Sequence, residues 1–258
     1  MRDQLEEAQR HLDDGYGRAQ QLDKVELPKR FYKEVGVAPV DSGFTVTLDG
    51  RPVHTPGKRP VVVPVASIAT AMANEWSAQG QFIDPTTMPM VRLINSAVEG
   101  GERSIPALRE EIIKFAGGDL LLYRADSPQE LVSQQEVLWD NALSHLSRHF
   151  GVSFEPTTGI IHRPQPQATL DRLAQAIAEE NLFGLTALVS ITGLTGSGLL
   201  ALGVWARLFA PEAVWTAAHV DEDYQIGQWG EDEEASERRA KRRKEFDIAV
   251  QVLHQCRA

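Results

Sequence analysis

Residues 181–206 read NLFGLTALVSITGLTGSGLLALGVWA and contain no charged side chain. One helix of this length would be long enough to cross a bilayer. However, glycine, serine and threonine gather at its centre, in residues 193–198, where a turn could join two shorter helices. The chain has no second apolar span of this length, so we expect a buried helical hairpin inside a bundle. The alternative is a membrane-associated protein that inserts residues 182–208.

The composition around this stretch is that of a soluble globular protein. The 258 residues are 42% hydrophobic and 24% charged, which is enough for one large or two modest domains. Acidic residues outnumber basic ones by 36 to 26, so the net charge is −10, which argues against a nucleic-acid partner. The single cysteine, Cys256, excludes an intrachain disulfide and a cysteine zinc cluster, and favours a reducing compartment.

The N-terminal third predicts a small antiparallel sheet with accompanying helices. Apolar residues alternate with threonines through residues 44–48, as in a half-buried strand, and Asp49-Gly50 is typical of a tight hairpin. Pro52 places the returning strand at an edge, and residues 61–63 predict a further strand. A helical period then follows residue 64, with Trp76 on its inward face and Gly80 placed to end the helix.

Helical patterns fill the rest of the chain. The polar, glycine-rich residues 99–102 suggest a domain boundary, so we expect an arm at 1–28, a β-rich domain at 29–100 and a helical domain at 101–258. Residues 127–130 (SPQE) predict a capping box that opens a helix ending at Gly151, with Trp139 facing inward. Further helices are predicted at about 104–116, 168–181, 183–194, 198–209, 211–222 and 233–255. The fold class is therefore α+β.

Catalytic and cofactor motifs are weak. His145 and His149 are spaced to hold one metal ion on a helix face, but no third ligand is evident. No nucleophile elbow, phosphate loop or dinucleotide fingerprint is present, so we expect no cofactor and no enzyme. A metal-dependent hydrolase that uses the two histidines remains the alternative.

Large aromatic residues stand among carboxylates in residues 221–231 (DEDYQIGQWGE). Such an acidic rim with aromatic residues is typical of protein recognition, although Tyr224 and Trp229 could equally pack a helix corner. The basic run at 238–244 follows acidic residues 231–237, and the two blocks nearly cancel. We therefore interpret the run as the solvated start of the last helix.

Several short motifs, taken in order, resemble one known family. They are residues 30–33 (RFYK), 48–53 (LDGRPV), 55–56 (TP), 75–76 (EW), 119–120 (DL), 123–124 (YR), Gln135 with Trp139, 224–226 (YQI) and 229–230 (WG). Together they resemble the assembly chaperones of the F1 sector of ATP synthase, in particular those for the alpha subunit. The resemblance runs from about residue 29 to the end of the chain.

The resemblance implies a non-enzymatic chaperone with a β-rich N-terminal and a helical C-terminal domain. Such a protein would bind the unassembled alpha subunit, shield its beta-facing interface from aggregation and release it during hexamer assembly. The implied partner-binding residues are Glu222, Tyr224, Gln225, Trp229 and Glu231, whereas Trp76 and Trp139 would act through folding. Eukaryotic members of the family work in the mitochondrial matrix, but the N-terminal residues are too acidic for a transit peptide. We therefore expect a bacterial protein of the cytoplasm. We expect no nucleic-acid partner, no stable membrane insertion and a monomer when free.

Overall fold

The computed structural model describes residues 27–256, so nearly all of the arm predicted at 1–28 lies outside the described residues. The chain divides into two compact units. In the smaller unit, Lys29 forms a β-bridge with Phe82, and the Ile83 amide donates to the Pro28 carbonyl over 2.8 Å. The larger unit comprises residues 32–77 and everything after residue 84, and it holds all the elements described below.

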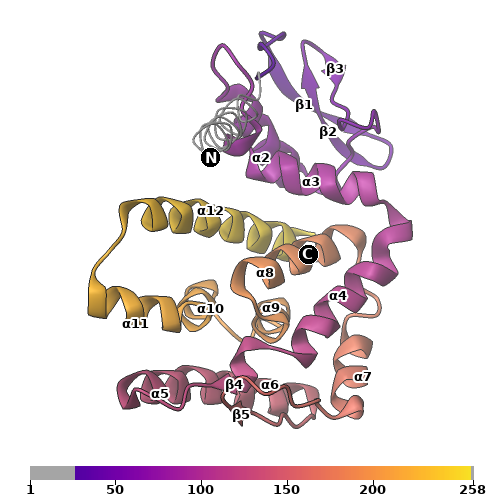
Figure 1. Cartoon of the computed structure of the whole chain (residues 1–258). Helices are drawn as coiled ribbons and strands as arrows, with labels where there is room; N and C mark the ends of the chain where they lie inside the picture. Colours follow the sequence, from indigo (N-terminus) through magenta and orange to yellow (C-terminus); the bar gives the residue numbers. More distant parts are fainter. Residues whose placement is uncertain (1–26, 257–258) are drawn as a thin grey trace, which may run out of the picture. The chain divides into compact units, whose positions relative to one another are not determined.

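The predicted antiparallel sheet is present in the larger unit (Figure 1). It contains β1 (Val35–Val40), β2 (Gly43–Leu48) and β3 (Arg51–Pro52) in the order β1-β2-β3. Asp49 and Gly50 both have positive φ, at 48° and 76°, as the tightest hairpin turns require. Pro52 lies on the edge strand as predicted. Residues 61–63 form no full strand, because only Val63 makes a β-bridge, to Phe44.

Two helices accompany this sheet. Helix α2 (Ala66–Ser77) packs on β1 and β2, and α3 (Pro89–Gly100) packs on α2. Helix α2 ends three residues before the predicted stop at Gly80. The Glu75 carboxylate accepts hydrogen bonds of 2.9 Å from the Met90 and Val91 amides, so it satisfies the first turn of α3. These contacts join α2 and α3 into one support for the sheet.

Helices make up most of the remaining chain, which confirms the α+β class. Their bounds are α4 (Ile105–Gly117), α5 (Gln129–Gln135), a π-helical turn (Glu136–Asp140), α6 (Asn141–Phe150), α7 (Gln167–Ala176), α8 (Leu182–Thr195), α9 (Gly198–Trp205), α10 (Pro211–Ala218), α11 (Val220–Trp229) and α12 (Glu233–Gln255). The short strands β4 (Tyr123–Arg124) and β5 (Thr157–Thr158) pair in parallel. The 3-10 turns lie at Pro85–Thr87, Glu102–Ser104 and Leu120–Leu122.

The uncharged stretch at residues 181–206 forms α8 and α9, which confirms the buried hairpin. Helix α8 ends at Gly196 with φ 69°, and the Ser197 side chain caps α9. Gly198 is needed here, because an added Cβ would lie 2.6 Å from the Ile112 carbonyl oxygen of α4. Helix α8 packs against α3, α4, α9 and α12. No helix in residues 27–256 is long and apolar enough to cross a membrane.

Three details of the helical prediction are wrong. Pro128, not Ser127, occupies the N-cap of α5 and makes no side-chain cap, while the Ser127 hydroxyl donates to the Asp126 carboxylate. The predicted helix at 211–222 is two helices that meet at His219, and the second continues to Trp229. The helices predicted at 168–181 and 198–209 end earlier, at Ala176 and Trp205. The domain boundary near Gly100 stays a prediction.

Candidate functional site

The acidic and aromatic residues of 221–231 lie mainly on α11, which ends at Trp229. Its first turn carries Asp221, Glu222 and Asp223, where carboxylates interact favourably with the helix dipole. Its C-cap is Gly230 with φ 87°, and Asp232 then caps α12 by accepting from the Ala235 amide over 2.7 Å. The chain therefore turns sharply from α11 into α12 (Figure 1).

A groove of about 290 Å³ lies between α11 and the start of α12. Glu222, Gln225 and Trp229 line it, so the structure brings three of the five predicted partner-binding residues together. Tyr224 is half-buried and Glu231 is exposed, and neither lines the groove. Trp229 is 80% exposed, which excludes the alternative that it packs the helix corner.

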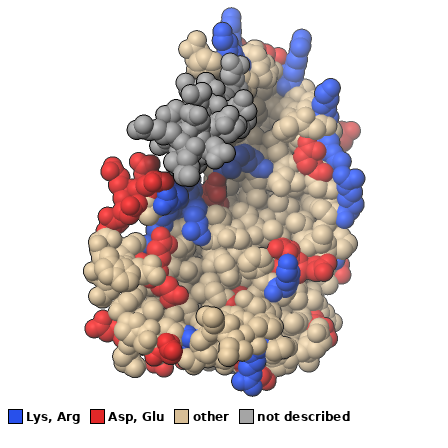
Figure 2. All heavy atoms as spheres, viewed as in Figure 1, with Lys and Arg blue, Asp and Glu red and all other residues tan. Residues whose placement is uncertain are grey.

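Acidic and basic side chains both lie around this groove. Figure 2 shows Asp and Glu side chains at the left edge of the view, where α11 turns into α12, with Lys and Arg beside them. Arg239 of α12 lines the groove and lies 2.5 Å from the Asp223 carboxylate. The lining of the groove therefore includes one basic side chain, Arg239, and the carboxylates of Glu222 and Asp232.

Two of the motif residues connect α10 and α11 to the bundle beneath them. The Gln135 amide donates to the Asp221 carboxylate over 2.7 Å, and its oxygen accepts from the Ala125 amide over 2.8 Å. Trp139 is buried, and its indole NH donates to the Ala217 carbonyl over 2.7 Å. These contacts link α5 and the π-helical turn to α10 and α11, so they set where α11 lies.

Arg124 contacts both Trp139 and Gln135. Its guanidinium lies 5.2 Å from the centre of the indole ring, and it donates to the Gln135 carbonyl over 3.0 Å. It also pairs with Asp140 at 2.5 Å. Burial lowers the pKa of Arg124, although the Asp140 carboxylate opposes this change. The motif residues at 124, 135 and 139 thus form one connected cluster.

Trp76 lies on α2, and no residue of α2 lines the groove beside α11. Its ring is half-buried and meets the Tyr32 ring edge-on at 5.6 Å, and the Tyr32 hydroxyl donates to the Trp76 carbonyl over 2.8 Å. Both aromatic residues belong to the motifs that carry the resemblance. Their contact joins the start of the larger unit to α2, which fits the predicted structural role.

The histidine pair does not gather a metal site. His145 and His149 are exposed on α6, and a ring nitrogen of His145 is hydrogen-bonded to the Asn141 carbonyl of its own helix. Across the described part of the chain, no three histidine, cysteine, aspartate or glutamate side chains are grouped to hold a metal ion. The structure therefore gives the hydrolase alternative no support.

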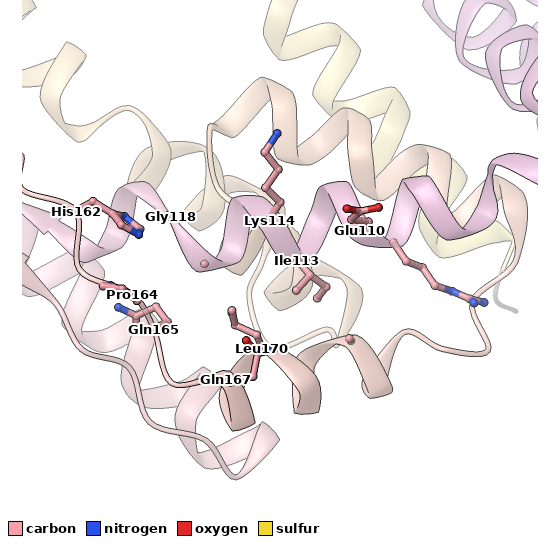
Figure 3. Close-up of a pocket in the computed structure, with 12 residues that line it drawn as sticks. Glu110, Ile113, Lys114, Gly118, His162, Pro164, Gln165, Gln167 and Leu170 are labelled. Carbon is pink, nitrogen blue, oxygen red and sulfur yellow. The ribbon is translucent and has the colours of Figure 1, made fainter.

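Two further hollows lie where no sequence motif predicts a site. One, of about 590 Å³, lies between α4 and α7, where Ile113 and Leu170 point toward one another (Figure 3). Ile160, two residues before His162 of its lining, is 97% exposed. The other, of about 430 Å³, lies between α5 with its π-helical turn and α10 with α11. Both are formed by elements far apart in sequence, so local patterns carry no signal for them.

An exposed indole beside carboxylates, on a helix anchored from below, is typical of a protein-binding surface. Comparisons with known proteins agree with that class. Residues 29–147 match the family model described as ATP12 chaperone protein. The crystal structure of a putative chaperone from Agrobacterium tumefaciens is 41% identical, with a TM-score of 0.83 over 88% of this chain and 86% of that one.

Two further relatives carry the family's name. The crystal structure of Atp12 from Paracoccus denitrificans is 35% identical, with a TM-score of 0.80 over 88% of this chain and 97% of that one. The mitochondrial protein atp12 of Schizosaccharomyces pombe is 22% identical over 221 residues, which are 81% of this chain and 76% of that protein. The chain therefore belongs to the ATP12 chaperone family, the F1 assembly factors that its motifs resemble.

Proposed function

We propose that this F1 assembly chaperone binds the unassembled alpha subunit and shields the surface that later meets the beta subunit. The observation that carries the proposal is Trp229, an indole that is 80% exposed at the end of α11. Together with Glu222, Tyr224, Gln225 and Glu231 it forms what we call the α11 surface. Family membership supports the chaperone role, and the alpha subunit is the partner that the motifs predict.

The chemistry of the α11 surface suits transient protein binding. Trp is among the residues that contribute most to protein–protein affinity when an interface buries them. The surrounding carboxylates steer a complementary partner and keep the free surface hydrated. The hydrogen bonds from Gln135 and Trp139 hold the helix in place before binding, so little ordering is needed when the partner arrives.

Release follows from competition and needs no covalent step. An unassembled subunit exposes an apolar interface, and a protein that covers it lowers the concentration of the aggregating species. The beta subunit displaces the chaperone if it binds the same surface more tightly. We accordingly propose that the chain works as a monomer, by binding and without a cofactor, and that its site of action is the bacterial cytoplasm.

Dilution of the same organism's alpha subunit from denaturant tests the proposal. With an equimolar amount of this chain, light scattering should fall and sizing should show a one-to-one complex. A matched sample with the Trp229→Ala variant should aggregate more. Unchanged scattering and no complex with the wild-type chain would contradict the proposed function.

A further inference from the structure

The hollow between α5 and α11 is a groove with an apolar lining, here called the α5–α11 groove. Val137 and Leu138 of the π-helical turn form one wall, and Thr216 and Val220 form the other. Its volume is about 430 Å³, enough for one or two large side chains. Val137 is 71% exposed at its rim, whereas Val220 is buried at the base of α11.

The helices that form this groove carry many carboxylates outside its apolar lining. Residues 129–140 contain Glu130, Glu136 and Asp140, and α10 with α11 contains four more carboxylates, yet neither stretch contains a lysine or arginine. Three of the seven carboxylates are paired with arginines of other elements, in the pairs Arg124–Asp140, Arg239–Asp223 and Arg243–Glu212. Glu130, Glu136, Asp221 and Glu222 form none of the ion pairs found among the described residues, so the helices around the groove retain negative charge.

Glu130 lies on the helix face that carries one wall of the groove. It is exposed, and it precedes Ser133, Gln134 and Val137 by three, four and seven residues, which places it on the same face of the helix. On the other wall, Asp223 lines the groove itself and is paired with Arg239, while Asp221 and Glu222 precede it without an ion pair. The occupant that this arrangement fits has an apolar side chain with basic residues next to it, because the apolar part is desolvated and the charges are complementary.

The groove also adjoins the α11 surface. Asp223 follows Glu222 directly on α11, and the two residues line different hollows, Asp223 the α5–α11 groove and Glu222 the groove beside α12. A single partner could therefore contact both sides of α11. The π-helical turn adds to this argument, since such turns occur frequently at functional sites.

We propose that the α5–α11 groove receives a segment of the client in which an apolar side chain is flanked by lysine or arginine. The proposal rests on the proposed function, since the client is the alpha subunit, and it names the chemistry of the segment that is bound. The apolar side chain enters between Val137 and Val220. The basic residues face Glu130 and the carboxylates at the start of α11.

The test measures the affinity of purified alpha subunit for variants of the full chain. Val137→Lys removes the apolar rim and adds a repelling charge, so we expect about a tenfold loss of affinity. Glu130→Lys should lower affinity about threefold and weaken its dependence on salt. The matched controls are Ile160→Lys, at another exposed apolar residue, and Glu110→Lys, in the lining of the hollow between α4 and α7. Both should bind within about twofold of wild type.

The milder variant Val137→Ser guards against loss of folding, and it should lower affinity in the same direction. Equal affinity of wild type, Val137→Lys and Glu130→Lys would overturn the groove proposal while leaving the chaperone function intact. An equal loss in the Ile160→Lys control would also overturn it, since the effect would not depend on this groove. Absence of any binding by the wild-type chain would overturn the proposed function and the groove proposal together.

Discussion

The Asp119 carboxylate accepts a 2.7 Å hydrogen bond from the hydroxyl group of Ser197, which lies 78 residues further along the chain. The same carboxyl group accepts from the Leu199 amide over 2.9 Å and from the Leu121 amide over 3.2 Å. Asp119 and Ser197 are fully buried. Asp119 therefore fixes the start of α9 against the 3-10 turn that follows α4, at the centre of the helical core.

Asp119 should make stability depend on pH. Burial raises the pKa of Asp119 from 3.8 to about 7, although its hydrogen bonds oppose the change. The folded state then keeps a proton that the unfolded chain loses above pH 4, so this contribution is greatest at low pH and is lost as pH rises toward 7. By linkage, the free energy of unfolding should fall by about 2 kcal/mol between pH 5 and pH 7 on account of this group.

Urea unfolding of the wild type and of Asp119→Asn at pH 5 and pH 7 checks this. The variant should be less stable at both pH values. Its side-chain NH2 group cannot accept a hydrogen bond, whereas both oxygens of the Asp119 carboxyl group accept one. Its stability should also vary less with pH than that of the wild type. Parallel pH dependence of the two proteins would contradict a titrating Asp119.

Trp139→Phe should destabilise the fold. The change removes the indole NH that donates to the Ala217 carbonyl and leaves that buried acceptor without this donor. The expected loss is about 1–3 kcal/mol in the free energy of unfolding, measured by urea titration. Trp229→Phe is the matched control, because the ring at this position is exposed. Its free energy of unfolding should equal that of the wild type. Equal stability of Trp139→Phe and wild type would show that the contact contributes nothing.

Trp229→Ala should weaken binding without weakening the fold. A central aromatic residue in an interface commonly accounts for about a tenfold or larger change in affinity. Titration calorimetry with the alpha subunit measures the affinity, and thermal unfolding should give the wild-type midpoint because Trp229 is exposed. Ile160→Ala, another exposed apolar truncation, should change neither quantity. Unaltered affinity of Trp229→Ala would remove Trp229 from the binding surface.

Charge reversal on the α11 surface should act mainly on association. Glu222→Lys and Glu231→Lys each replace a carboxylate that would attract a basic partner, so the association rate at low salt should fall about threefold or more. The difference from wild type should shrink at high salt, because screening removes the effect of exposed charges. Stopped-flow measurements at two salt concentrations check both points. If either variant folds and binds like the wild type, that carboxylate is not a contact residue.

The core of the fold could be predicted because its local signals agree. The glycine-rich break in residues 193–198 marks the turn between α8 and α9, and the apolar period of α12 places Phe246 and Leu253 in the core. The predicted capping box is absent because Pro128 occupies the N-cap position, so Ser127 lies outside the helix. Helix α11 was missed because its acidic residues and Gly227 hide its weak apolar period.

The candidate site could be predicted only in part. The motifs pointed to Trp229 and Glu222, and the exposed indole agrees with a binding role. The support beneath them could not be foreseen, because Gln135 and Asp221 are 86 residues apart and no local pattern places them together. The same holds for the α5–α11 groove, whose walls come from helices that meet only in the folded chain.

Competition between this chain and the beta subunit for the alpha subunit tests the central claim most directly. A purified equimolar complex of the chain with the alpha subunit is mixed with increasing beta subunit, and the species are separated by size with light-scattering detection. Our account predicts that the chain is released free as the alpha and beta subunits associate. A stable ternary complex, or failure of the chain to bind the alpha subunit at all, would contradict it.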